Sequence, residues 1–137
     1  ICYMREYPKQ FQKVVNYLKK SNISVSIGKG TCYMSYMYKG RRHKEIIIHH
    51  NYNLEKNGLY ALLHEAGHSL QTNHKYGPDH YKNIDDTVKP KEFNMYQFIN
   101  ENDAWEKGLK LGKSLRLKLD PKSFNQQKED ALLTYYV

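Results

Sequence analysis

The sequence contains little of what marks a disulfide scaffold or a membrane protein. It has only two cysteines, Cys2 and Cys32, which form no zinc-ribbon or redox pattern. The sequence does not decide whether they form a disulfide with each other. No apolar run approaches the roughly 20 residues that a membrane-spanning helix needs. We therefore expect a soluble protein and favour an intracellular or virion-associated location. The sequence contains no signal peptide, but it begins at Ile1 and not at Met. The absence of a signal peptide therefore does not exclude a leader upstream of Ile1.

Acidic residues are also scarce relative to basic ones. The chain has 14 Asp and Glu against 22 Lys and Arg, which gives a net charge of +8. Such a charge can attract nucleic acid or an acidic surface. However, the lysines between residues 107 and 118 are expected on solvated helix positions. Tyrosines such as Tyr33, Tyr36 and Tyr38 more often pack a core or a sheet edge than stack on bases. Nucleic acid is thus a weakly supported partner, no membrane partner is expected, and the oligomeric state is undefined.

The segment His64-Glu65-Ala66-Gly67-His68 carries the clearest chemical signal. It matches HExxH, a zinc-peptidase pattern, which a chain of this composition contains by chance about 0.02 times. Four residues span about one helical turn, so both imidazoles lie on one helix face and can bind the same Zn²⁺. Glu65 lies beside them, where a general base would meet a zinc-activated water.

The surrounding residues favour an amphipathic helix for this motif. Its apolar positions lie on the side of the helical wheel opposite the two histidines: Leu59, Leu63, Ala66 and Leu70. Asn53 or Asn57 is suited to cap the start of the helix. Gly67 costs about 1 kcal/mol relative to Ala in a helix, and it lets another backbone approach closely.

A catalytic zinc usually has three protein ligands, and Glu101 is the best third candidate. On a helical wheel it lies among residues that would form an apolar stripe: Ala104, Trp105, Gly108, Leu111, Gly112 and Leu115. A carboxylate there needs a partner, and zinc would supply one. Asp103 is expected to face away. The small residues, four apart, predict close packing against the first helix.

The two motifs together, HEAGH and ENDAW, resemble the gluzincin side of the zincin metallopeptidases in a compact, minimal form. The resemblance covers roughly residues 43 to 115. It implies a zincin-like fold and zinc bound by His64, His68 and Glu101. In larger gluzincins an acidic residue four positions after this glutamate orients a zinc histidine. Trp105 stands there in this chain, so that partner must come from elsewhere.

Two rival third ligands lie in the segment after the HExxH motif. His74 has the spacing of the metzincin pattern, but Gln71 replaces its turn glycine. The segment through His80 also resembles the SprT-like DNA–protein crosslink proteases, but Tyr76 occupies their histidine position. If neither of these two resemblances holds, we expect His74 and His80 to be polar loop residues that bind no metal.

The remaining pattern predicts one α+β domain over residues 1–137, zincin-like and of order α-β-β-β-α-α-α. The expected elements are a helix starting at Pro8, a hairpin of strands 23–27 and 31–38, a third strand at 44–49, the HExxH helix, a loop over 71–93, the Glu101 helix, and a helix from Asp120-Pro121 to about residue 135. By family analogy, the third strand would be an edge strand that pairs with an extended substrate.

The sequence thus predicts a zinc-dependent metallopeptidase that hydrolyses peptide bonds. Glu65 would be the catalytic base, His64, His68 and Glu101 the metal ligands, Zn²⁺ the cofactor, and a peptide or protein the substrate. Candidates for an oxyanion-stabilising group lie in the loop: His74, Tyr76, His80 and Tyr81. The alternatives are a SprT-like DNA-associated protease and a non-catalytic zinc-binding protein with a structural or assembly role.

Overall fold

The structure, a computed structural model, describes residues 6–71 and 90–135. Its elements are α1 (Lys9–Lys20), β1 (Ile23–Gly28), β2 (Cys32–Tyr38), β3 (Arg41–His49), α2 (Asn57–Ser69), α4 (Pro90–Ser114), α5 (Pro121–Leu132) and the short 3-10 helix η1 (Leu133–Tyr135). The α+β class is confirmed, and the helices and strands follow in the predicted order. The loop predicted over 71–93 lies mostly outside the described residues, and helix α4 already begins at Pro90.

The strand order in the sheet is β1-β3-β2, and it corrects two predictions. Strand β1 pairs in parallel with β3, and β2 pairs antiparallel with β3. The hairpin predicted between strands 23–27 and 31–38 is therefore wrong. The third strand is the central strand and not an edge, because it pairs with β1 on one side and with β2 on the other. Its residues Ile46 and Ile48 are fully buried in the core.

The backbone of the actual hairpin explains why the prediction failed. Strands β2 and β3 are joined by Lys39 and Gly40, which both have positive φ, at 50° and 74°. Positive φ at both central positions is typical of the type I′ turn, which matches the twist of paired strands. By contrast, Gly28 belongs to β1, and its carbonyl accepts a hydrogen bond from the backbone N–H of His50 at 2.9 Å. The glycines at 28 and 30 thus precede a crossover and not a hairpin turn.

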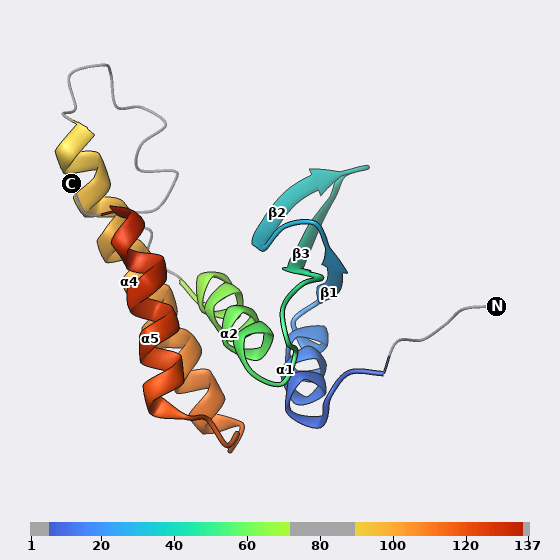
Figure 1. The fold of residues 1–137 in the computed structure, drawn as a ribbon. Coiled ribbons are helices and arrows are strands. Elements are labelled where there is room, and N and C mark those ends of the chain that lie inside the picture. Colours follow the sequence, from blue (N-terminus) through green and yellow to red (C-terminus); the bar gives the residue numbers. More distant parts are fainter. Residues whose placement is uncertain (1–5, 72–89, 136–137) are drawn as a thin grey trace.

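Helices α1 and α2 cover one face of the sheet, and α2 lies between the sheet and the pair of α4 and α5 (Figure 1). The four predicted apolar positions of α1 are all buried: Phe11, Val14, Val15 and Leu18. Helix α2 is buried on nearly every side because it packs against both layers. The HExxH motif therefore lies on the central helix of the molecule.

Helices α2 and α4 cross in close contact at two glycines. A Cβ atom on Gly67 would lie 1.9 Å from the carbonyl oxygen of Ala104, and one on Gly108 would lie 2.3 Å from the carbonyl oxygen of Leu63. Real Cβ atoms do not approach oxygen so closely. The predicted close packing is confirmed, and it sets the distance between the HExxH helix and the helix that carries Glu101.

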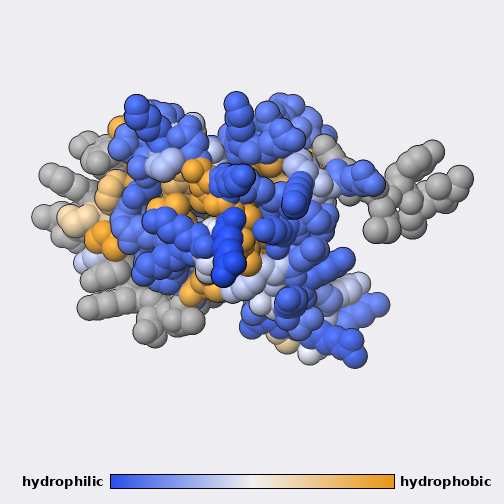
Figure 2. All heavy atoms as spheres, turned by 90° about the horizontal axis from the view of Figure 1, so that it is seen from below, coloured by the Kyte–Doolittle hydropathy of each residue, from blue (hydrophilic) through white to orange (hydrophobic). Residues whose placement is uncertain are grey.

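The last helix begins as predicted, with Asp120 as N-cap accepting a hydrogen bond from the Lys122 N–H and Pro121 in the first turn. Its residues Phe124 and Leu132 are buried. Seen from below, most of the described surface is hydrophilic, with apolar side chains exposed near the middle of the view (Figure 2). Among the described helices, none is long and apolar enough to cross a membrane.

Candidate metal centre

Three potential ligand atoms converge where α2 passes α4. The Nε2 atoms of His64 and His68 lie 2.7 and 2.9 Å from the same carboxylate oxygen, Oε2 of Glu101. Among the described residues this is the group of three ligand-type side chains that could hold a metal ion, with all donor atoms within 4.8 Å of one another. The structure therefore brings together the three residues that the sequence predicted as ligands, although His64 and Glu101 are 37 positions apart.

The donor set is of a kind that can hold a metal ion, and its three donor atoms lie within 4.8 Å of one another. Two imidazoles and one carboxylate are a common ligand set of catalytic zinc, with bonds of about 2.0–2.2 Å. Tetrahedral ligands at that distance lie about 3.3 Å apart, a few tenths of an ångström more than the two hydrogen-bonded distances here. Burial alone would raise the pKa of Glu101, but hydrogen bonds from His64 and His68 outweigh it and lower the pKa to about 2. The carboxylate is thus held ionised, as a metal ligand must be.

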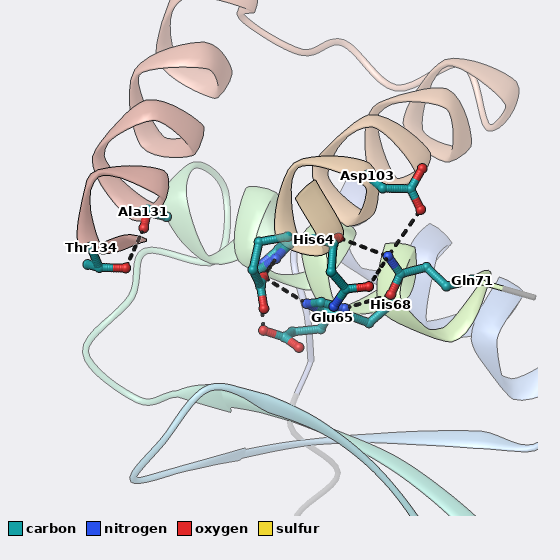
Figure 3. A network of polar contacts seen from close by, with 9 residues as sticks. His64, Glu65, His68, Gln71, Asp103, Ala131 and Thr134 are labelled. Carbon is teal, nitrogen blue, oxygen red and sulfur yellow. Dashed lines mark hydrogen bonds and ion pairs between the residues drawn. The ribbon is translucent and has the colours of Figure 1, made fainter. Parts of the chain in front are cut away.

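Gln71 fixes the orientation of His68. Its side-chain oxygen lies 2.9 Å from Nδ1 of His68, and its amide nitrogen donates to the carbonyl oxygen of Asn100 at 2.9 Å and to Oδ2 of Asp103 at 3.1 Å (Figure 3). Because the amide nitrogen of Gln71 is committed to these acceptors, its oxygen must accept from His68, so Nδ1 carries the proton. Nε2 of His68 faces Glu101, and if it gives up the proton that it shares with this carboxylate, it presents a lone pair to a metal while Nδ1 keeps its own proton.

Gln71 thus takes the role that the sequence left unassigned, that of the residue that orients one of the two histidines. Asp103 was expected to face away, and it does not reach the metal centre, but its carboxylate accepts from Gln71 and from Lys107 at 2.8 Å. Gln71 itself is only 9% exposed. From the sequence, Gln71 stands out only as a departure from the metzincin pattern. Its contacts with Asn100 and Asp103 arise from the packing of α2 against α4, which no local sequence signal indicates.

Trp105 holds the other histidine by stacking. Its indole lies parallel to the His64 ring, with centroids 4.3 Å apart and an interplanar angle of 5°. Trp105 also contacts the ring of Phe124 edge-on, with ring centroids 5.4 Å apart and an interplanar angle of 81°. A large ring buried between two helices cannot rotate freely, so it fixes the plane of His64.

Glu65 lies beside the two histidines and is 6% exposed. Burial raises the pKa of its carboxyl group, while His64, His68 and a hydrogen bond from the backbone N–H of Tyr33 lower it in part. Its Oε1 lies 3.5 Å from Nδ1 of His64. A carboxylate whose pKa is raised toward neutrality is suited to accept and return a proton near pH 7.

An open cleft of about 480 Å³ exposes this cluster to solvent. One wall is the start of β2 with the preceding residue: Thr31, Cys32 and Tyr33. Cys32 is a free thiol there, whereas Cys2 lies outside the described residues. Another wall includes Tyr135 of η1, whose pKa is raised by burial and by the Glu101 carboxylate.

In the sequence, Tyr135 marks only the expected end of the last helix. Its phenol instead lines the cleft that contains Glu65 and Glu101. No pattern in the sequence links residue 135 to the HExxH motif, because the packing of α5 beside α4 brings it there. The four loop candidates for an oxyanion-stabilising group, and the rival ligand His74, lie outside the described residues.

Comparisons of this chain with protein-family models, with curated proteins and with solved structures found no match. The function therefore has to be argued from the geometry and the chemistry of the site.

Proposed function

We propose that this protein is a zinc-dependent metallopeptidase of the gluzincin type. The observation that carries the proposal is the convergence of His64, His68 and Glu101 with a buried Glu65 directly beside them. A structural zinc site has no use for a buried base with a raised pKa, and burying one costs stability. Catalysis explains why such a group is kept next to a ligand set.

Bound zinc would supply a Lewis acid that polarises a carbonyl group and acidifies water. Glu65 would accept the proton of the attacking water and later donate it to the leaving amine. Gln71 and Trp105 keep the rings of His68 and His64 in the orientation that binding requires. Tyr135, across the cleft, is placed to donate a hydrogen bond to the substrate carbonyl oxygen as negative charge develops on it.

The substrate would bind along strand β2. This strand pairs with β3 on one side only, so its other edge has no strand partner among the described residues. Its first residues line the cleft beside Glu65. An extended peptide can add to such an edge through backbone hydrogen bonds. The role that the sequence analysis gave to residues 44–49 thus passes to β2.

The decisive experiment is Glu65→Gln, which preserves size and removes the base. The variant should retain one zinc per chain and the wild-type fold, while hydrolysis of an extended-peptide library falls about 10²-fold or more. Glu55→Gln, on the exposed surface before α2, is the matched control and should cleave like the wild type. Equal cleavage by wild type and Glu65→Gln, or none by either with zinc in place, would favour the non-catalytic alternative.

A second experiment separates the gluzincin from its rivals. Glu101→Ala should remove most zinc at equilibrium, because it deletes one of three ligands. His74→Ala should bind zinc like the wild type. If His74→Ala loses the metal and Glu101→Ala keeps it, the metzincin or the SprT-like hypothesis replaces the gluzincin one.

A further inference from the structure

The turn end of the β2–β3 hairpin, residues 35–44, projects away from the helices (Figure 1). We refer to it as the hairpin tip. Three of its apolar side chains are among the most exposed large ones: Tyr36 at 42%, Met37 at 57% and Tyr38 at 56%. Tyr36 and Tyr38 thus lie on the edge strand β2, one of the two places expected for them, but their rings are not packed into the core. Folding alone does not explain exposed rings at this end of the sheet.

Three of the rings at the tip form one aromatic surface. Tyr36 is directly opposite His43 in the register of the two strands, so both side chains lie on the same face of the sheet. Their rings stack, with centroids 5.5 Å apart and an interplanar angle of 17°. Tyr38 meets His43 edge-on at 5.8 Å. Cross-strand contacts thus hold the rings in place before any ligand arrives.

The same ten residues carry four cationic side chains: Lys39, Arg41, Arg42 and Lys44. Among the described residues, none of the four makes an ion pair with an acidic group. Lys39 lies over the ring of Tyr38 at 5.4 Å, and Arg42 donates to the hydroxyl of Ser35 at 3.4 Å. Arg41 is directly opposite Tyr38 in the register and therefore shares the face of the rings, whereas Arg42 and Lys44 alternate to the other face of the sheet. Lys39 and Arg41 are therefore available to a polyanion that also contacts the rings.

We propose that the hairpin tip binds single-stranded nucleic acid. Lysine and arginine neutralise phosphates, and exposed aromatic rings stack on bases with about 1–3 kcal/mol per base. An acidic peptide would use the cations but has no planar bases for Tyr36 and Tyr38. A duplex keeps its bases stacked inside, where the rings cannot reach them. The combination of rings and neighbouring cations fits a single strand better than it fits an acidic peptide or a duplex.

Strand β2 links the tip to the cleft. Cys32 at the cleft and Tyr38 at the tip are six residues apart, which is about 20 Å along a strand. The tip is thus outside the metal centre, and binding there needs neither zinc nor Glu65. The inference does not depend on the proposed peptidase activity.

The test measures binding of fluorescent dT20 and rU20 to the full chain by polarisation, with the metal chelated. Tyr36→Ala and Tyr38→Ala should each weaken binding about fivefold or more, with the salt dependence unchanged. Tyr36→Phe and Tyr38→Phe keep the rings and should bind like the wild type. This rescue separates lost stacking from a misfolded hairpin.

Charge variants complete the test. Lys39→Gln with Arg41→Gln should lower the slope of log affinity against log salt by about 1.4, because two phosphate contacts are lost. Lys19→Gln with Lys20→Gln removes the same charge from the end of α1 and is the control. Equal weakening by both pairs would mean diffuse attraction and would overturn the proposal. Tighter binding of duplex DNA or of a poly-glutamate peptide would overturn it as well.

Discussion

Gly67→Ala tests whether the close crossing of α2 and α4 holds the metal centre together. Two effects of this substitution oppose each other. Alanine has the better helix propensity and would stabilise α2 by about 1 kcal/mol. Against this, the new Cβ would lie 1.9 Å from the carbonyl oxygen of Ala104 and 3.0 Å from the backbone nitrogen of Gly108. These are backbone atoms of a packed helix, which cannot turn aside as a long side chain can.

The clash should decide the sign. Contact between a methyl group and an oxygen needs a separation of about 3.2 Å, so the two helices must move apart by about 1.3 Å. Overpacking of this kind costs about 1–3 kcal/mol or more, which exceeds the gain in propensity. The same movement separates His64 and His68 on α2 from Glu101 on α4, and a site loosened by about 1 Å loses function. Zinc affinity should therefore fall at least tenfold.

The assay pairs thermal unfolding of the metal-free protein with zinc titration against a chromophoric chelator. Gly30→Ala is the control, because a Cβ at Gly30 has no neighbour within 4 Å. It should leave both quantities near the wild-type values. A Gly67→Ala protein that melts at or above the wild-type temperature and binds zinc normally would refute the reasoning.

Three further predictions follow from the contacts around the ligands. Gln71→Leu keeps the volume of the side chain but removes the acceptor for Nδ1 of His68. Zinc affinity should therefore fall about 10–100-fold. A change in zinc affinity below twofold would contradict this role of Gln71. In the metal-free protein the lowered pKa of Glu101 adds stability that is present above pH 4.5 and lost as the pH falls toward 2. The raised pKa of His68 adds stability that is fully present below pH 6.5 and is lost as the pH rises from there through the raised pKa. Glu101→Gln should flatten both dependences in urea unfolding, and an unchanged pH profile would show that the pairing adds no stability. Tyr135→Phe should lower kcat more than it changes KM, with zinc retained, and full activity would exclude the phenol as a hydrogen-bond donor to the substrate.

The helices were predictable because helical periodicity is local. The spacing of Phe11, Val14, Val15 and Leu18 placed the buried face of α1, and the residues after Glu101 placed that of α4. Strand pairing is not local. The sequence contains two turn signals, one at residues 28–30 and one at Lys39-Gly40, and only the chain's tertiary packing decides which of them closes a hairpin.

The same distinction separates the site residues that were predicted from those that were missed. His64, Glu65 and His68 are defined by spacing within one helix, and Glu101 by its place in an apolar stripe. Gln71 acts through partners about 30 residues away, and Tyr135 lines the cleft through the packing of another helix. Such roles depend on how helices cross, which no single stretch of sequence encodes.

The stacking of Trp105 on His64 gives the protein a built-in optical reporter. Trp105 is the only tryptophan of the chain, it is 2% exposed, and its indole N–H has no hydrogen-bond partner among the described residues. The emission of an indole responds to the group that is stacked on it, and here that group is a ligand of the candidate metal centre. Metal binding to His64 should therefore change the intrinsic emission of the unlabelled protein, so the occupancy of the centre can be followed in solution in real time.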